Sequence, residues 1–519
     1  MATVPPLDAE SAAAAAASRQ DFLRDAADMD LGTTPDRTAN YTLARDYLDG
    51  KQRTLLSERM LAYLRRSGLD FSENFLETIV DALISRLDVV GFTSEDSSAG
   101  DTASEDGETD DIGAICMDWW AANRMDARQN VVYDYTLGEG DCFVFIDYDP
   151  VNQRPRYSVN KPYNCKAIYS DDDPDEMLYA VKVWNTDQRH SIGEMNDPET
   201  LQTSRPEPIK RMNVYWPDRV EKWFTPHSNA GDTKAMWFPH FDDGDAGWPV
   251  MLTGHDGKPL GIPVVHFRNQ PRGRQYGRSE VWSEIPQQDG LNKLILDLHA
   301  VADYEGAERW ATGLTAEDAG ALKRAPGEVW VAGSSEAKFG QFEQAQVDGL
   351  LAAINAALSR MSARSSTPLH LLNPTGTLPS GETLKVAEAP LTAKGKDRQT
   401  DLGDEWSQVN RKAIRWHNTF GPGPMLDESV HVQTEWDAIE SRNDESESRT
   451  ALNHSELGAS KFTILSKLGY NPEVEAERRA EEAQSALDHG TIGGGLPGPM
   501  PVSAAEQPVT VEGDATAAA

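Results

Sequence analysis

The pattern of apolar residues changes at Pro286, and this change constrains the fold more than any other feature of the sequence. Before Pro286, runs rich in Val, Tyr, Trp and Phe mix with helical segments, without the repeating strand–helix–strand rhythm of a doubly wound sheet. After it, apolar stripes predict one helix over Leu291–Trp310 and another over Val347–Met361. The short segment Ala311–Phe342 between them contains one predicted strand, Glu328–Ala332. The predicted fold class is therefore α+β, with a helix–insert–helix unit joined to a mixed domain.

A long polar helix is predicted to follow this unit. The Pro- and Gly-containing stretch Thr367–Gly381 separates the second helix from a polar helical region, Glu382–Phe420, which we expect to bend near Pro390. A strand over His431–Trp436 precedes a last helical unit that runs from Glu440 to about Leu487. The remaining tail is rich in Gly, Pro and Ala and is expected to be disordered.

The first half of the chain is predicted to mix helices and strands. Helical spacing of apolar residues covers Phe71–Phe92 and Trp119–Leu137. Pro217 and Asp218 predict a tight turn between two strands. Five runs are predicted to be strands: Cys142–Tyr148, Leu178–Trp184, Met212–Trp216, Val220–Phe224 and Ile262–Phe267. Residues 1–36, which are rich in Ala and Asp, are expected to form a flexible arm.

The charge of the chain limits its partners. Of 519 residues, 84 are acidic and 49 are basic, so the formal net charge is −35. Tight binding of nucleic acid depends on Lys and Arg that displace counterions, so most of this surface would repel DNA. Either DNA has no part in the function, or DNA moves past the protein without adhering. No apolar run approaches the roughly 18–20 residues of a membrane span, so a soluble protein made in a cytoplasm is expected.

Motifs that carry chemistry are not found in the sequence. There is no phosphate-binding loop, dinucleotide fingerprint or zinc-protease motif, and the three cysteines are far apart. Two acidic clusters are candidate metal sites, but neither has a complete ligand pattern: Asp171–Glu176 lacks other ligand spacing, and Asp242–Asp245 has Thr253 where a calcium loop needs Glu. We therefore predict no catalytic, cofactor-binding or metal-binding residue and no enzymatic activity.

One local basic run stands out in this acidic chain. It consists of Arg268, Arg272, Arg274 and Arg278. Such a run can contact phosphates or an acidic neighbouring subunit, or it can be a solvated loop with intramolecular ion pairs. The sequence leaves these alternatives open.

Several segments, in one order along the chain, resemble the portal proteins of tailed bacteriophages, particularly those of long-tailed phages. The most specific is Gly261–Phe267, which is followed by Gly277–Glu280 and by Gln288–Asn292. The other matching segments are Tyr41–Gly50, Asn74–Phe92, Gly138–Phe145, Ser380–Leu384, Trp436 and Leu468–Pro472. Each segment is weak alone, and their shared order over roughly Tyr41–Glu482 carries the resemblance.

The resemblance implies a portal fold with a mixed α/β wing, a two-helix stem, a clip, a long wing helix and a helical crown. The corresponding parts are a flexible arm (1–36), the wing (37–285), the first stem helix (286–310), the clip (311–345), the second stem helix (346–366), the channel loop (367–381), the long wing helix and strand (382–438), the crown (439–487) and a disordered tail (488–519). It also implies channel-loop residues Asn373, Thr375 and Thr377, and clip residues for partner docking, Lys323, Arg324, Glu328 and Trp330.

The resemblance further implies partners and location. A ring of about twelve copies would stand at the portal vertex of the virion after assembly in the host cytoplasm. Its expected partners are the large terminase subunit, the head–tail connector or adaptor, capsid and scaffolding proteins, and double-stranded DNA that passes without sequence specificity; no cofactor and no membrane are expected. The alternatives are another phage head or adaptor protein and, with Asp171–Glu176 as its candidate site, a metal-dependent enzyme acting on nucleic acid.

Overall fold

A computed structural model describes a large part of the chain. It covers residues 9–29, 41–52, 73–95, 112–186, 209–226, 236–242, 247–305, 309–314, 336–341, 347–373, 381–439 and 478. The chain divides into two units, Met1–Ile439 and Glu440–Ala519, and the fold described below is that of the first unit. None of the helices in the described ranges combines the length and apolarity that crossing a bilayer requires.

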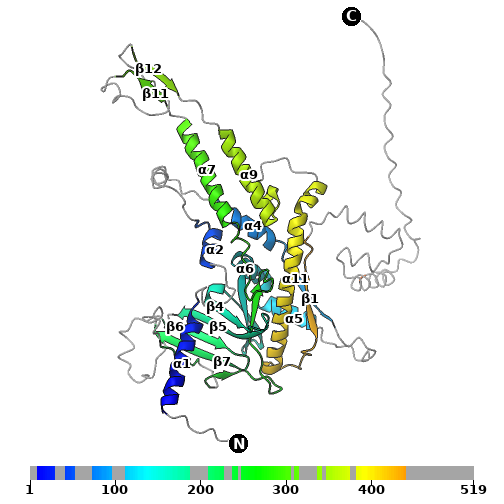
Figure 1. Ribbon diagram of the computed structural model, residues 1–519. Helices are drawn as coiled ribbons and strands as arrows, with labels where there is room; N and C mark the ends of the chain where they lie inside the picture. The colour runs from blue at the N-terminus through cyan, green and yellow to red at the C-terminus, as the bar shows by residue number, and fades with distance from the viewer. Residues whose placement is uncertain are drawn as a thin grey trace, which may run out of the picture. The chain divides into compact units, whose positions relative to one another are not determined.

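An antiparallel sheet forms one layer of the first unit (Figure 1). Its strands lie in the order β4 (Cys165–Tyr169), β5 (Met177–Thr186), β6 (Ile209–Tyr215), β7 (Arg219–Pro226) and β8 (Phe238–Pro239), with β9 (Val250–Met251) also paired to β7. The predicted hairpin at Pro217 and Asp218 is confirmed, because Tyr215 pairs with Val220 and the Trp216 N–H donates to the Arg219 carbonyl at 2.9 Å.

Helix α1 (Ala9–Ala27) packs on this sheet, within the segment expected to be a flexible arm. Leu23 is fully buried in the same apolar cluster as Val181 and Val183 of β5. Gln20 exchanges two hydrogen bonds with the Trp237 backbone, and Arg19 forms an ion pair with Glu221. The expectation of a flexible arm is therefore wrong over this helix. Phe22, Leu23 and Ala26, which follow the alanine run in sequence, form an apolar face that packs on the sheet.

A second layer contains the strands β3 (Arg154–Asn160), β2 (Asp141–Asp149) and β10 (Val264–Arg268), with β2 in the middle. Helices α5 (Ile112–Ala122) and α6 (Met125–Gly138) lie against it, where one helix over Trp119–Leu137 was expected. The break falls at Arg124, whose φ of 58° no right-handed helix accommodates. Asn123 stabilises the break, because its side chain bonds the Trp119 and Pro155 carbonyls and the Tyr157 N–H.

Helix α4 (Phe75–Ile84) is shorter than the predicted helix over Phe71–Phe92. Residues Val89–Glu95 form strand β1, which pairs antiparallel with β13 (His431–Trp436). The partner strand lies more than three hundred residues away in sequence, so the local apolar period could not reveal this pairing. The other predicted strands in the described residues are confirmed by β2, β5, β6, β7, β10 and β13.

A two-helix arm, formed by α7 (Ile285–Glu305) and α9 (Val347–Ser365), extends from these layers (Figure 1). The two helices pack side by side, and β11 (Arg309–Thr312) pairs with β12 (Lys338–Gln341) at the far end. The first helix was expected to reach Trp310, but it ends at Glu305 and Trp310 belongs to β11. The predicted strand Glu328–Ala332 lies outside the described residues.

The long helix α11 (Gly381–Phe420) follows the arm and the short helix α10 (Leu369–Leu372). Pro390 lies inside α11, as the sequence indicated. The second half of α11 crosses the core, where Trp406 is fully buried between the rings of Trp120 and Phe267, with centroid distances of 4.8 Å and 4.6 Å. The Trp406 indole N–H donates to the Tyr133 hydroxyl at 3.1 Å, so its polar atom is satisfied in the core.

Candidate functional site

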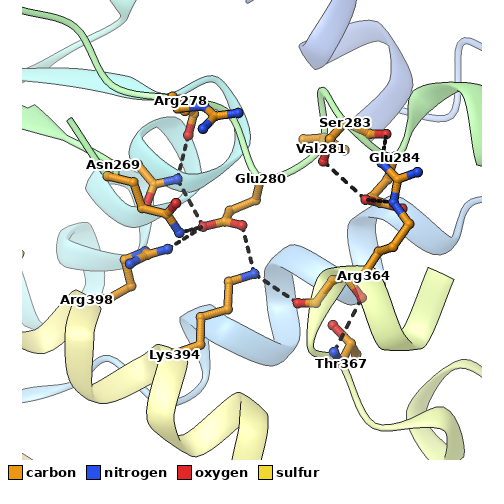
Figure 2. Close-up of polar contacts among 12 residues, drawn as sticks. Asn269, Arg278, Glu280, Val281, Ser283, Glu284, Arg364, Thr367, Lys394 and Arg398 are labelled. Carbon is orange, nitrogen blue, oxygen red and sulfur yellow. Dashed lines mark hydrogen bonds and ion pairs between the residues drawn. The ribbon is translucent and has the colours of Figure 1, made fainter. Parts of the chain in front are cut away.

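A polar junction lies where the base of the two-helix arm meets α11 (Figure 2). Three elements meet there: the loop that leads from β10 into α7, the end of α9, and the first half of α11. The loop can approach the turn between α6 and β2 closely because residue 277 is glycine: a Cβ there would lie 2.0 Å from the Gly140 carbonyl oxygen and 2.6 Å from the Asn269 nitrogen. The junction therefore depends on a backbone contact that no larger residue permits.

Glu280 is the centre of the junction. Its carboxylate accepts from Lys394 Nζ at 2.7 Å and from Arg398 Nη2 at 2.9 Å, both on α11 (Figure 2). Asn269 Nδ2 donates to the same carboxylate at 3.1 Å. The side chain of Glu280 is 10% exposed and that of Arg398 is 3% exposed, so water has little access to this ion pair. One carboxylate thus ties the loop before α7 to the long helix.

The electrostatics of this group favour a charged Glu280. Burial alone would raise the pKa of Glu280, but the nearby Lys394 and Arg398 outweigh it and hold the pKa below its usual value. Glu280 is therefore an anion at neutral pH, and it offsets one of the two positive charges of Lys394 and Arg398. A buried pair of this kind stabilises the fold only while all its members are present.

A second ion pair fastens the end of α9 to the same loop. Arg364 Nε lies 3.2 Å from Oε1 of the buried Glu284, and Arg364 Nη2 donates to the Ser283 carbonyl at 3.0 Å (Figure 2). Lys394 also donates to the carbonyl of Ser365, the last residue of α9, at 3.0 Å. The base of the arm is thus cross-linked to α11 and to the loop by charge-assisted hydrogen bonds.

Beside the junction is an open pocket with a volume of about 1030 Å³. Six basic and three acidic residues line it: Arg272, Arg274, Arg278, Arg364, Lys394 and Arg398, with Glu280, Asp397 and Asp401. We call this space the arginine pocket. It collects three of the four arginines in the basic run of the sequence. Arg268 is separated from them: its side chain is 14% exposed, pairs with Asp175 at 2.9 Å and lies over the Tyr169 ring.

The residues predicted for the channel loop and the clip fall mostly outside the described part of the chain. Asn373 lies at the end of α10, and its side-chain amide donates to Asn355 of α9 at 3.2 Å. The remaining predicted residues, Thr375, Thr377, Lys323, Arg324, Glu328 and Trp330, lie outside the described residues. The roles given to these residues stay predictions.

The acidic clusters form ion pairs in the structure. Asp242 is held by Arg211 at 2.8 Å and by Lys222 at 2.9 Å. Burial opposes its charge, yet these two cations lower the pKa of Asp242 well below its usual range. In the Asp171–Glu176 turn, Asp175 pairs with Arg268. Within the described ranges, no three His, Cys, Asp or Glu side chains come together as a metal site.

A buried chain of hydrogen bonds connects the two sheets. His266 Nε2 lies 2.9 Å from Asp141 Oδ1, His266 Nδ1 lies 2.8 Å from the Tyr169 hydroxyl, and the Tyr41 hydroxyl donates to Asp141 at 2.7 Å. The side chains of Asp141 and His266 are each 1% exposed. A substrate has no access to groups so deeply buried, so this chain joins β2, β4 and β10 as a structural element.

The buried carboxyl of Glu405 makes stability depend on pH. Burial raises the pKa of Glu405 to about 8, because desolvation outweighs the attraction of Arg268, whose Nε lies 3.9 Å away. The folded state therefore holds this proton more tightly than the unfolded chain, whose carboxyl has a pKa of about 4.3. The contribution of Glu405 to stability is present at acidic pH and is lost as the pH rises towards 8.

We expect Glu405→Gln to remove the part of the stability loss at rising pH that Glu405 causes. The urea midpoint of the wild type should fall between about pH 5 and pH 8, and that of the variant should fall less, because the amide carries no charge to bury. The exposed Glu435→Gln serves as the control and should follow the wild type. Parallel curves for the wild type and Glu405→Gln would show that Glu405 is not the group responsible.

Comparisons with known proteins give two findings. A family model described as "Phage portal protein, SPP1 Gp6-like" matches residues 34–489. Among solved structures, a chain described as "Virion of native gene transfer agent (GTA) particle" is similar at a TM-score of 0.42 and 10% identity, covering 83% of this chain and 99% of that one. No curated protein matches the chain. The family match spans both layers, the arm and the junction described above.

Proposed function

The chain belongs to the SPP1 Gp6-like family of phage portal proteins, and from this premise we propose that about twelve copies close into the ring through which double-stranded DNA enters and leaves the capsid. It is a structural protein of the virion, and its family forms a capsid-associated ring. In this proposal the ring is assembled in the host cytoplasm and occupies the portal vertex. The packaging motor (the large terminase subunit) docks on it first, and the head–tail connector follows.

The observation that carries this proposal is the incomplete burial of the two-helix arm. The buried residues of α9 are Ala357, Leu358, Met361 and Ser365, all in the half nearest the core. Towards the far end Leu351 is 44% exposed, and at the tip Trp310 and Phe339 are 37% and 42% exposed. Exposed apolar surface of this kind marks a contact with another protein, and in a ring the adjacent copies would cover it.

The parts of a portal subunit can be assigned on this basis. We propose that α7 and α9 are the stem (residues 286–310 and 346–366), and that the segment 311–345, which includes two of the four residues of β11 and all of β12, is the clip that meets the motor and the connector. The channel loop is assigned to 367–381, and α11 with β13 belongs to the wing (382–438). The crown is assigned to 439–487. Capsid and scaffolding proteins would contact the ring from the capsid side.

The acidic character of the chain supports a passive role towards DNA. A net charge of −35 per copy gives a ring a strongly negative field. Carboxylates repel the phosphate backbone, so DNA driven by the motor would slide past without adhering. The negative charge disfavours binding of DNA, and a passive channel does not require such binding.

Native mass spectrometry and negative-stain electron microscopy of the purified protein test the proposal. We expect a particle of about twelve copies of the 57.1 kDa chain, with a central opening. A monomer or dimer that persists across salt and protein concentrations would contradict the ring. The mass also gives the number of copies directly, so a closed ring of another size would correct the subunit number alone.

A further inference from the structure

We propose that the arginine pocket receives carboxylate side chains of the neighbouring copy in the ring. This inference rests on the proposed ring and names one of the surfaces that would hold it together. The pocket faces solvent in the single chain and carries more basic than acidic side chains, although the chain as a whole is strongly acidic. Its three exposed arginines, Arg272, Arg274 and Arg278, would form the contact.

The arginines stand on a loop that the fold holds in place. The Asn269 N–H donates to the Gly140 carbonyl at 2.9 Å, and the Asn269 side chain donates to the Arg278 carbonyl at 2.6 Å (Figure 2). The Arg278 N–H returns a bond of 2.7 Å to the Asn269 carbonyl. Between these hydrogen-bonded ends of the loop, Arg272 has a left-handed backbone conformation with φ of 46°. The backbone that carries the three arginines is therefore held in place before a partner binds.

The carboxylates nearest to these arginines are already engaged or too far away. Glu280 binds Lys394 and Arg398, and Glu284 binds Arg364. In the described part of the chain, none of Arg272, Arg274 and Arg278 has a carboxylate oxygen within 4.0 Å, and in Figure 2 Arg278 joins the network only through its carbonyl. With six basic and three acidic residues in its lining, the pocket has an excess of positive charge.

Carboxylates of a second copy fit this site better than DNA phosphates do. Each copy carries 84 acidic residues, so in a ring where one face meets a different face of the next copy, carboxylates are the abundant partner for guanidinium groups. Trp282, which is 40% exposed, also lines the pocket. An exposed tryptophan beside arginines is typical of contacts between proteins, and a paired DNA duplex offers it no apolar surface.

The test compares three triple variants of the full-length protein. Arg272→Glu, Arg274→Glu and Arg278→Glu together reverse the charge of the pocket, and the same three positions changed to Lys keep it. The control carries Arg124→Glu, Lys258→Glu and Arg411→Glu, which make the same charge change at exposed positions outside the pocket. Native mass spectrometry over a salt series measures the fraction of chains in rings, and circular dichroism checks folding.

We expect the Glu triple to reduce the ring fraction at least tenfold, with the Lys triple and the control close to wild type. In wild-type rings, we also expect Arg272, Arg274 and Arg278 to resist modification by phenylglyoxal and to react when the ring is dissociated; this readout holds even if a variant fails to fold. Normal rings from the Glu triple, or arginines that react equally in both states, would overturn the inference while leaving the ring itself intact. Rings that form normally but lose DNA binding would show that the pocket serves phosphates instead. No rings from the wild type would contradict the proposed function itself.

Discussion

Replacing Glu280 by alanine is expected to lower the free energy of unfolding by about 3–5 kcal/mol, the usual cost of removing one partner from a buried ion pair. The variant leaves the ammonium of Lys394 and the guanidinium of Arg398 without the carboxylate that binds both of them. It also removes one of the two acceptors of the Asn269 side chain, which keeps its bond to the Arg278 carbonyl. Equilibrium urea unfolding, followed by tryptophan fluorescence at one fixed protein concentration, measures the change.

The control for this variant is Glu176→Ala. Glu176 is exposed on the turn between β4 and β5, so its loss should change the free energy of unfolding by no more than about 0.5 kcal/mol. Glu280→Gln should lie between the two, because the amide keeps the volume and one acceptor but loses the charge. If Glu280→Ala unfolds at the same urea concentration as Glu176→Ala, the junction does not hold the arm to α11.

The second large effect is expected at Trp406, where alanine should cost about 3–5 kcal/mol. Its ring fills the space between Trp120 and Phe267, and its indole N–H satisfies the Tyr133 hydroxyl in a fully buried setting. Truncation would leave a cavity at the contact between α11, α5 and β10. Thermal and urea unfolding both measure the loss.

Phe420→Ala provides the comparison for Trp406→Ala. Phe420, the last residue of α11, is 49% exposed on the single chain and lies outside the arginine pocket, so its truncation should leave the unfolding of the subunit nearly unchanged. Equal losses from the two variants would mean that the core is not organised around Trp406.

The sequence predicted those elements whose signal is local. The hairpin at Pro217 and Asp218 followed from turn residues between two strand-like runs, and β13 and α11 were each predicted from the residues of one uninterrupted segment. The errors have a common cause. The first residues of β1, Val89–Phe92, were assigned to a helix because the partner strand β13 lies far along the chain. The break at Arg124 depends on contacts of Asn123 with distant carbonyls. Tertiary contacts decided both positions.

The junction was predictable only in part. The basic run at Arg268–Arg278 was visible in the sequence, and so were the two possibilities of a bound partner or a solvated loop. Lys394 and Arg398 lie one turn apart on a polar helix, and nothing in the sequence distinguishes them from the exposed charged residues of that helix. Only the packing of α11 against the loop shows that they face Glu280, more than one hundred residues earlier in the chain.

Cryo-electron microscopy of the purified particle tests the central claim most directly. The account predicts a closed ring in which α7 and α9 of adjacent copies pack around a central channel, with β11 and β12 at one end and an acidic side chain of the next copy in each arginine pocket. A reconstruction with separate, unassociated subunits, or a ring whose two-helix arms make no contact with neighbouring copies, would contradict it.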